Sequence, residues 1–515
     1  MAQPGEEQVK TNPYLIALSI MLGTFMEVLD TTVANVSLPY IAGNLSAGID
    51  ESTWILTSYL VSNAIVLPVS GWLSRLFGRK RFFLFCIFLF AFSSTLCGLA
   101  GSLGMLVFFR ILQGLGGGAL QPVSQAILFD AFPREKQGIG MAIYGMGVVF
   151  APIIGPTLGG WITDNYTWRW IFFINIPIGI LSFFLVQNFV ADPPDFKKSG
   201  ARNIDYIGLG LLTLGLGSLQ IVLDKGQRED WFESNFIIEL TGVTLIAVLL
   251  FIIWELRNKS PVLQLRLFKD PNLTAGVSLM FCLGFVLYSS LALLPIYVQT
   301  LMGYTAMESG MVLTPGGVSV LIMMPFVGRF VGLVDARLMV GTGLVICAIS
   351  LFQMSHFNLD LGFWAITWPR IIQGFGLAFL FIPINVVSLS YLPKDQIGNG
   401  TGIMNLARNL GGSLGIALVT TVLARRTQYH QATLGSHIDL FDSVTRDRLD
   451  AIFNNLVAGG LDRVSAKGMA TATLYGQLLK QANMKAFVDT FWAVGWICLL
   501  IFPILLLMKK PKGAH

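Results

Sequence analysis

Residues 14–41 read YLIALSIMLGTFMEVLDTTVANVSLPYI, and this stretch decides the fold. A run of about 28 mostly apolar residues is long enough to cross a bilayer as an α-helix. It contains two acids, Glu27 and Asp30, although an ionised side chain at that depth costs at least about 2.5 kcal/mol. The spacing i, i+3 places both acids on one helix face, with Thr31 beside them. Acids kept there at such a cost indicate a proton or cation site.

The whole composition is that of an integral membrane protein. Of 515 residues, 54% are hydrophobic and only 12% are charged, whereas soluble proteins contain about 25% charged residues. The net charge of +5 is spread over many short loops, so we expect no nucleic-acid partner. The pattern predicts an all-α protein with fourteen spans, near 14–40, 51–73, 82–101, 104–129, 138–162, 170–190, 205–223, 236–256, 272–299, 306–331, 337–355, 363–389, 396–423 and 487–508.

The loops carry their positive charge on one side. Basic clusters follow the second, fourth, sixth and eighth spans and end the chain, while the alternate short loops contain few lysines or arginines. Cytoplasmic loops carry the excess of Lys and Arg. We therefore expect both termini in the cytoplasm, which agrees with an even number of spans.

The chain repeats itself at an offset of 260 residues. Arg110-Ile-Leu-Gln-Gly114 recurs as Arg370-Ile-Ile-Gln-Gly374, each near the start of a span entered from outside. Parallel repeats of six spans describe the major facilitator architecture. The sequence thus predicts two six-helix bundles, 14–190 and 272–508, with an inserted helix pair at 205–256.

A second organisational feature is the long segment 425–485 between the last two spans, on the outer face. Apolar residues recur there at helical spacing, and Gly459-Gly460 interrupts them. An amphipathic helical hairpin is expected. Two interpretations stay open: a cap lying on the transporter or on headgroups, or a docking surface for a periplasmic partner.

Arg110 is the expected partner of the acids. Asp30 lies about 16 Å and Arg110 about 9 Å from the outer ends of their spans, at 1.5 Å per residue. A nearby arginine stabilises the carboxylate and burial destabilises it, so such an acid can respond to a pH gradient. The alternative is a permanent structural ion pair. Glu27 could equally bind a cationic substrate.

The second half contains no acid at the corresponding depth. Arg370 therefore has no obvious counterpart, and proton coupling is expected in the first bundle only. Arg408 lies near mid-depth, where it could offset the acid pair, hold the two bundles together, or bind backbone carbonyls within the second bundle.

The fifth span carries small residues and two prolines within 151–160. Small residues let helix backbones approach closely, and neighbouring helices can satisfy the backbone groups that a proline frees. The segment is expected to be either a hinge or sliding contact in alternating access, or simply a bent packing helix. The residues concerned are Pro152, Gly155, Pro156, Gly159 and Gly160.

These motifs together resemble the 14-spanning drug:proton antiporters of the major facilitator superfamily, and most closely the EmrB-type inner-membrane pumps of Gram-negative bacteria. The resemblance rests on Leu29–Pro39, Arg110–Gly114, Gly147–Gly160, Trp168–Pro177 and Asn405–Gly415. It implies proton-driven efflux of hydrophobic toxic compounds, together with a periplasmic membrane-fusion adaptor and a TolC-like outer-membrane channel. No nucleotide-binding loop, metal-ligand cluster or nucleophile–base spacing stands out in the sequence, so we expect no enzymatic activity and no cofactor.

On this reading Asp30, Glu27 and Arg110 handle the proton. Glu27, Thr31, Asn35 and Arg408 are the expected substrate contacts, between the bundles near mid-membrane. An exporter of a specific solute such as a fatty acid, or a non-transporting membrane scaffold or sensor, remains an alternative.

One motif departs from the family pattern. The segment from Gly71 to Lys80 resembles the cytoplasmic motif between spans two and three, but Arg75 stands where the family usually has an Asp that helps to close the inner gate. Gly78, Arg79 and Lys80 remain. We expect these residues to act in gating together with Arg370, and the usual ionic closure is in doubt.

Overall fold

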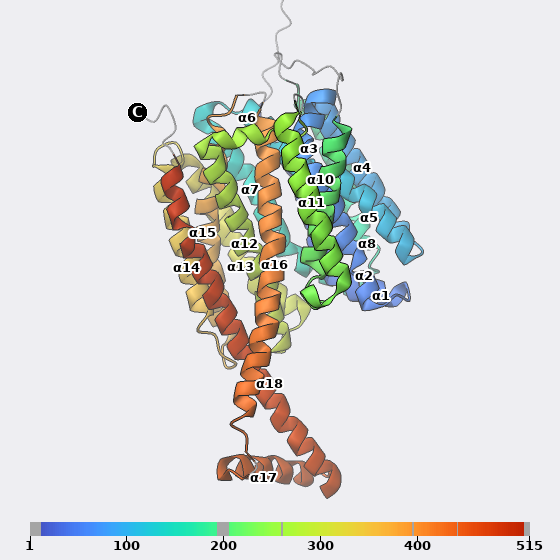
Figure 1. Ribbon diagram of the computed structural model, residues 1–515, viewed down its shortest axis with the longest axis vertical. Coiled ribbons are helices and arrows are strands. Elements are labelled where there is room, and N and C mark those ends of the chain that lie inside the picture. Colours follow the sequence, from blue (N-terminus) through green and yellow to red (C-terminus); the bar gives the residue numbers. More distant parts are fainter. Residues whose placement is uncertain (1–11, 193–204, 259–260, 394–395, 440, 509–515) are drawn as a thin grey trace, which may run out of the picture.

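The computed structural model describes residues 12–192, 205–258, 261–393, 396–439 and 441–508. Within these ranges the regular structure is entirely helical, and fourteen helices are long and apolar enough to cross a membrane. This confirms the predicted fold class and number of spans. With an even number of spans, the first and last helices have their chain ends on the same side of the molecule (Figure 1).

In chain order, a first group of six spans is followed by a pair of helices and then by a second group of six spans. The first group consists of α1 (Pro13–Asn44), α3 (Trp54–Phe77), α4 (Arg79–Leu99), α5 (Leu103–Gly117) with α6 (Leu120–Ala131), α7 (Gln137–Asn165), and α8 (Trp170–Phe173) with α9 (Asn175–Phe189); the short α2 (Ile49–Ser52) precedes α3. Within the first group, α1 packs mainly against α7, α9 and α6. The pair is α10 (Tyr206–Lys225) and α11 (Asn235–Arg257). The last group is α12 (Pro271–Thr300), α13 (Ala306–Phe330), α14 (Ala336–Met354), α15 (Phe363–Leu389), α16 (Ile397–Gly435) and α18 (Arg463–Leu500).

Two spans that were expected to be continuous are interrupted. The fourth span breaks between α5 and α6, where Gly116, Gly117 and Gly118 lower the helix propensity. The sixth span breaks at Ile174, and Pro177 follows in the first turn of α9, a position where proline is tolerated. Both breaks lie near the acids of α1.

The last two spans also differ from expectation. The α16 helix continues to Gly435, and α18 already begins at Arg463, where spans ending at 423 and starting at 487 were expected. No proline interrupts either continuation, and α18 stays helical through Gly468 and Gly476. Where the two continuations leave the membrane spans, Asp489 of α18 accepts a hydrogen bond from Arg426 Nε of α16 at 2.6 Å and lies 2.7 Å from His430 Nε2. The continuations project from the molecule and carry α17 (Ser443–Ala458) at their far end (Figure 1).

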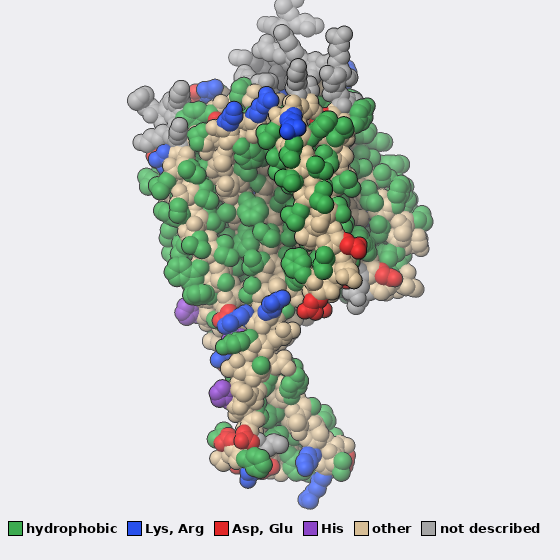
Figure 2. All heavy atoms as spheres, in the orientation of Figure 1, with side chains coloured by type: hydrophobic (Ala, Val, Ile, Leu, Met, Phe, Trp, Pro, Cys, Tyr) green, Lys and Arg blue, Asp and Glu red, His purple; other side chains and the backbone are tan. Residues whose placement is uncertain are grey.

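This projection defines two sides, which we call the hairpin side and the termini side. Figure 2 shows a broad belt of hydrophobic side chains between the two sides, with Lys and Arg at its termini-side edge and also along the projection. The most exposed part of the belt includes α11, whose side chains at Leu245 and Ile246 are 67% and 63% exposed. Such a belt is the surface that a lipid bilayer covers.

Helices α3, α6 and α7 of the first group pack directly against the second group, and α3 lies against α16. The α7 helix packs against α1 on one side and α13 on the other, and α6 lies against both α1 and α16. The α10 helix packs on α3 and also touches α16. The acids of α1 therefore lie close to the contact between the two groups.

Candidate functional site

Asp30 is buried on α1 and holds a buried ion pair. Its Oδ2 accepts from Arg110 Nη1 at 2.5 Å, and its Oδ1 accepts from Gln113 Nε2 at 2.9 Å and from Asn175 Nδ2 at 2.8 Å. The Arg110 side chain is fully buried, and its guanidinium lies 4.2 Å from the centre of the Tyr59 ring. The expected contact between Asp30 and Arg110 is thus present in the structure.

Two residues of this cluster were not singled out from the sequence. Gln113 lies one turn beyond Arg110, inside the repeated motif, and Arg110 Nη1 also donates to its Oε1 at 2.8 Å. Asn175 is the first residue of α9, at the break in the sixth span, and it lies inside the quoted segment Trp168–Pro177. Both motifs contained the signal, but helical periodicity does not tell which polar residue faces an acid on another span.

Glu27 lies one helical turn before Asp30 on α1, nearer the termini side, and has different hydrogen-bond partners. Its Oε1 accepts from Asn63 Nδ2 at 2.9 Å and from Tyr59 Oη at 3.2 Å, and its Oε2 accepts from Gln121 Nε2 at 2.6 Å. Three neutral donors therefore surround this carboxylate, whereas Asp30 faces a guanidinium. The two acids share a helix face but occupy separate polar sites.

Arg408 reaches across from α16 to the first group of helices. Its Nη2 donates to Gln121 Oε1, and it acts electrostatically on Glu27. Among the sequence alternatives, this favours contact between the two halves over backbone binding within the second. Its Nε and Nη1 atoms are buried and have no hydrogen-bond partner within the described residues.

Thr31 and Asn35 lie apart from the polar clusters. The Thr31 hydroxyl donates to the Val28 carbonyl of its own helix at 2.7 Å, and the Asn35 side chain is exposed. Neither donates to Glu27 or Asp30 in the described part of the structure.

The small residues of α7 bring it close to helices of both halves. An added Cβ at Gly155 would meet the Thr32 side chain of α1, and one at Gly159 would meet Val33. On the other side of α7, Thr157 lies directly against Gly310 of α13. This proline-containing span is therefore a shared contact between the two halves.

The motif at the end of α3 forms contacts on the termini side. Gly71 approaches the backbone of Gly398 on α16 so closely that an added Cβ would lie 2.5 Å from its carbonyl carbon. Arg79 forms an ion pair with Asp130, and Asp192 accepts from the backbone N–H of Lys80 at 2.9 Å. Gly78 has φ +94°, a left-handed conformation that favours glycine.

The sequence analysis had not assigned a role to Asp130 or Asp192. Both acids follow apolar spans directly, so each could be taken for an ordinary loop residue. The structure brings them to the basic residues at the start of α4. Lys80 Nζ also donates to the Gln187 carbonyl at 2.7 Å, so the basic pair ties α4 to α6 and α9.

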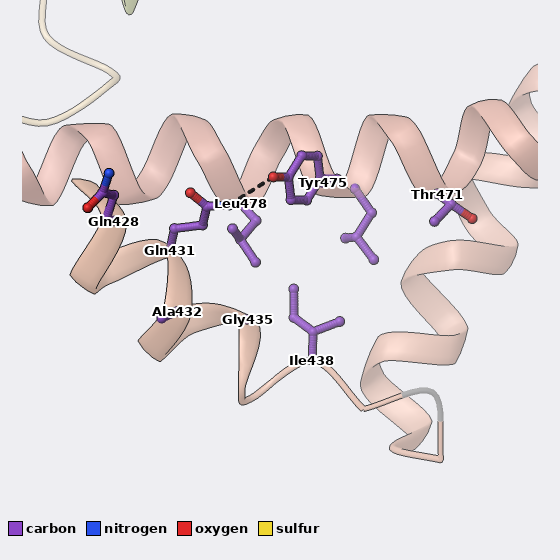
Figure 3. A pocket seen from close by; sticks show the side chains of 9 residues that line it. Gln428, Gln431, Ala432, Gly435, Ile438, Thr471, Tyr475 and Leu478 are labelled. Atoms are coloured by element: carbon purple, nitrogen blue, oxygen red, sulfur yellow. Dashed lines mark hydrogen bonds between the residues drawn. The ribbon is translucent and has the colours of Figure 1, made fainter. Parts of the chain in front are cut away.

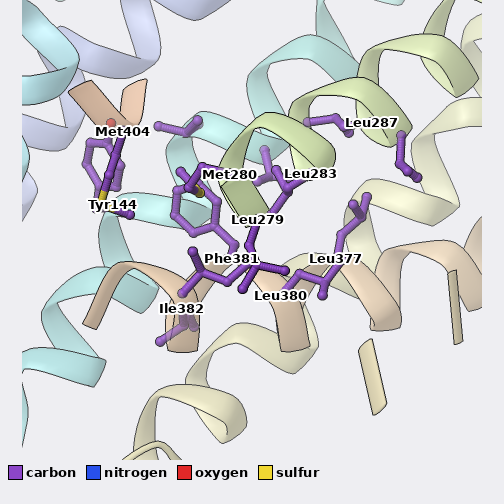
Figure 4. Close-up of a cluster of buried hydrophobic side chains, with 14 of the residues drawn as sticks. Tyr144, Leu279, Met280, Leu283, Leu287, Leu377, Leu380, Phe381, Ile382 and Met404 are labelled. Atoms are coloured by element: carbon purple, nitrogen blue, oxygen red, sulfur yellow. The ribbon is translucent and has the colours of Figure 1, made fainter. Parts of the chain in front are cut away.

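A buried apolar cluster adjoins the polar sites between the two halves. Tyr144 of α7 stacks on Phe381 of α15, with ring centres 6.1 Å apart. Figure 4 shows these rings beside Met280 and Met404, with leucines of α12 and α15 behind them. This cluster thus combines aromatic, thioether and aliphatic side chains.

Comparison with known proteins identifies the class. A family model described as Major Facilitator Superfamily matches residues 20–416, and the chain belongs to this superfamily. It is therefore a multi-pass membrane transporter and not an enzyme.

The similarity extends to particular transporters. The chain is 37% identical to the multidrug export protein EmrB of Escherichia coli (strain K12), over 97% of this chain and 96% of that protein. It is 36% identical to the fatty acid resistance protein FarB of Neisseria gonorrhoeae, over 96% of each chain. It is thus an EmrB-like transporter.

Solved structures agree with the fold. A double-tryptophan mutant of XylE has a TM-score of 0.63 at 15% identity, covering 97% of each chain. The human organic anion transporter MFSD10 (TETRAN) has a TM-score of 0.60 at 14% identity, covering 98% of this chain and 100% of that one. At these identities the likeness concerns the fold alone.

Proposed function

We propose that this protein is a proton-driven exporter of hydrophobic compounds across the bacterial inner membrane, with both termini in the cytoplasm. The observation that carries the proposal is the pair of buried carboxylates on α1, Glu27 and Asp30, beside the contact between the two halves. Buried ionisable groups inside a membrane mark ion pathways and proton relays. The similarity to EmrB supports drugs as the cargo.

The two acids have different tasks in this proposal. Asp30 forms a buried ion pair with Arg110, and in this proposal the pair loosens during the transport cycle. Glu27 is surrounded by neutral donors, so its protonation breaks no ion pair with a direct partner. Glu27 takes up and releases the transported proton, and the Asp30–Arg110 pair controls the access of protons to Glu27 from the hairpin side.

The cargo binds between the halves near mid-membrane. The Tyr144, Phe381 and Met404 side chains give it an apolar wall, and flexible methionines adapt to ligands of different shape. Thr31 and Asn35 provide polar contacts on the face of α1 that is not packed against the helices around the acids.

Arg408 favours a second candidate, export of an anionic amphiphile such as a fatty acid. A buried guanidinium with two nitrogens lacking partners in the described chain can bind a carboxylate. The similarity to FarB points to the same cargo. Competition of a long-chain fatty acid with a neutral drug, abolished by Arg408→Gln, would support this candidate; unchanged competition would exclude Arg408 as its contact.

The projection on the hairpin side is the proposed contact for a periplasmic adaptor that leads to a TolC-like channel. Between α16 and α18 lies a groove of about 580 Å³. Figure 3 shows Ile438 and Leu478 directed into it, with Tyr475 bonded to Gln431 beside them. The Phe441 and Val464 side chains are 87% and 85% exposed near its far end, and exposed apolar patches mark protein contacts.

Transport is tested with Asp30→Asn in proteoliposomes. This variant should insert and fold but lose export driven by an imposed pH gradient, because the neutral amide cannot form the ion pair with Arg110 that controls access to Glu27. Export at the wild-type rate would exclude a role for Asp30 in coupling.

The adaptor contact is tested separately by replacing residues 436–462 with a short linker. This change keeps both membrane helices and removes α17. Adaptor co-purification should weaken while transport in proteoliposomes continues; an intact complex would count against docking there.

A further inference from the structure

One face of α6 carries amide side chains that meet the second half on the termini side. Gln121 and Gln125 are one turn apart and both are buried. Gln125 Oε1 accepts from Asn405 Nδ2 of α16 at 2.7 Å, and its Nε2 donates to Asn385 Oδ1 of α15 at 3.3 Å. These bonds join the two halves without an ion pair.

The same face is bonded through its backbone as well. The Thr401 hydroxyl of α16 donates to the Pro122 carbonyl of α6 at 3.0 Å. Near the end of α3, the contact of Gly71 with Gly398 closes the same side. Hydrogen bonds between uncharged groups and close backbone packing therefore contribute to the contact on the termini side. We call the contacts of Gln125 and Thr401, together with the bond from Arg408 to Gln121, the amide gate.

Gln121 ends the amide gate at mid-depth, and its orientation is fixed from both sides. A guanidinium only donates hydrogen bonds, so Arg408 requires Gln121 Oε1. The Nε2 group is then left to donate to Glu27 at 2.6 Å. Gln121 therefore connects the acid of the first half with the cation of the second.

Protonation of Glu27 disturbs this arrangement. The carboxylate accepts from three donors, and a protonated carboxyl group has one more hydrogen and one acceptor fewer. Asn63 and Tyr59 belong to α3 and move with the first half. Gln121 cannot rotate its amide by a half turn, because its NH₂ group would then face Arg408.

Other titratable and charged groups also surround Glu27. On neighbouring helices these are Tyr59 of α3, Tyr144 of α7, Tyr288 of α12 and Arg408 of α16, and further along the same face lies Asp30 with Arg110 of α5. Arg408 is the cation of this set that belongs to the second half. The bond through Gln121 therefore transmits a change at Glu27 across the contact between the halves.

We propose that Gln121 is the positioning residue that couples protonation of Glu27 to the release of Arg408 and the opening of the amide gate. This inference rests on the proposed function.

The test follows the distance between the halves on the termini side as pH changes. Spin labels at Arg134→Cys and Leu333→Cys report it, since both residues are exposed on that side. Four native cysteines are buried, and Cys282 is replaced by serine. The unmodified site should open on acidification, and Gln121→Leu should shift the midpoint by at least one pH unit or leave the gate open throughout.

Matched variants keep the test decisive. Gln121→Asn retains the amide but is too short to reach both partners, so it should act like Gln121→Leu even if the leucine variant folds poorly. Gln220→Leu removes another buried amide between helices, which donates to Ser413 at 2.9 Å, and should keep the original midpoint. An unchanged midpoint in both Gln121 variants overturns the role of Gln121, whereas no pH response before substitution overturns the proposed coupling itself.

Discussion

Both halves carry a buried arginine at equivalent positions. Among the described residues, Arg110 of the first half is paired with an acid, whereas Arg370 of the second half is bonded to neutral groups. Arg110 Nη1 bonds to Asp30, and Arg370 Nη1 bonds to the Ser290 hydroxyl at 3.0 Å. Ser290 lies 260 residues after Asp30, as Arg370 lies after Arg110. Each arginine also donates to the glutamine one turn beyond it.

The same offset takes Glu27 to Leu287, which belongs to the buried apolar cluster (Figure 4). At the positions of the two acids, the second half therefore carries a hydroxyl in place of Asp30 and a leucine in place of Glu27. The shared arginine geometry supports the packing of both halves, and the acids add chemistry to the first. We infer that the first half binds and releases the proton, while the second half supplies Arg408 and, with Phe381 and Met404, most of the apolar side chains that contact the cargo.

The largest effect is expected when the first half is made like the second. Asp30→Ser leaves Arg110 fully buried without its countercharge, and removal of one partner of a buried pair costs about 3–5 kcal/mol. Export driven by a pH gradient should fall to background, and thermal unfolding in detergent should occur at a clearly lower temperature. Normal export by this variant would remove the distinction between the halves.

A large but more selective effect is expected from Glu27→Leu, which copies Leu287. The three donors around Glu27 lose their acceptor, so export should slow at least tenfold and should no longer follow the pH gradient. Glu27→Gln keeps a hydrogen-bonding group and separates the loss of a proton site from the loss of packing. Rates that still follow the gradient in both variants would assign the proton to Asp30 alone.

The sequence predicted most of the fold because membrane physics leaves few choices. Lengths of apolar runs predicted fourteen spans, and the repeat placed Arg110 and Arg370 at equivalent positions. The sequence analysis expected helices in the segment 425–485, but it did not predict that α16 and α18 continue into this segment from the membrane spans without a break. The breaks before Leu120 and Asn175 were missed because hydropathy over a window does not register a single interrupted turn.

The site was predicted less completely, for a different reason. Rare charges inside spans are easily found, so Glu27, Asp30, Arg110 and Arg408 stood out. The amides that bind them do not stand out, because Asn and Gln inside spans are common enough to serve packing or function. Their roles depend on which helices are neighbours, and Gln121 connects residues almost 400 positions apart in the chain.

A moderate effect is expected when a larger side chain is introduced where α12 packs against the backbone of Arg408 on α16. An added Cβ at Gly284 of α12 would lie 2.0 Å from the Arg408 carbonyl oxygen, and overpacking of this kind costs about 1–3 kcal/mol. Gly284→Ala should lower the unfolding temperature and slow export. Gly242→Ala on α11 is the control, because open space surrounds that position; equal behaviour of the two variants would contradict close packing of α12 on α16.

The smallest effect is expected from Ser290→Ala, at the position that corresponds to Asp30. Arg370 loses one neutral acceptor but keeps Gln373, so the free energy of unfolding should fall by about 1 kcal/mol, the usual net value of such a bond. Export and its dependence on the pH gradient should stay unchanged, since Ser290 has no proton to exchange at neutral pH. A variant that unfolds normally but follows the gradient less steeply would show that the second half takes part in coupling, and the asymmetry between Asp30 and Ser290 would then be one of strength and not of kind.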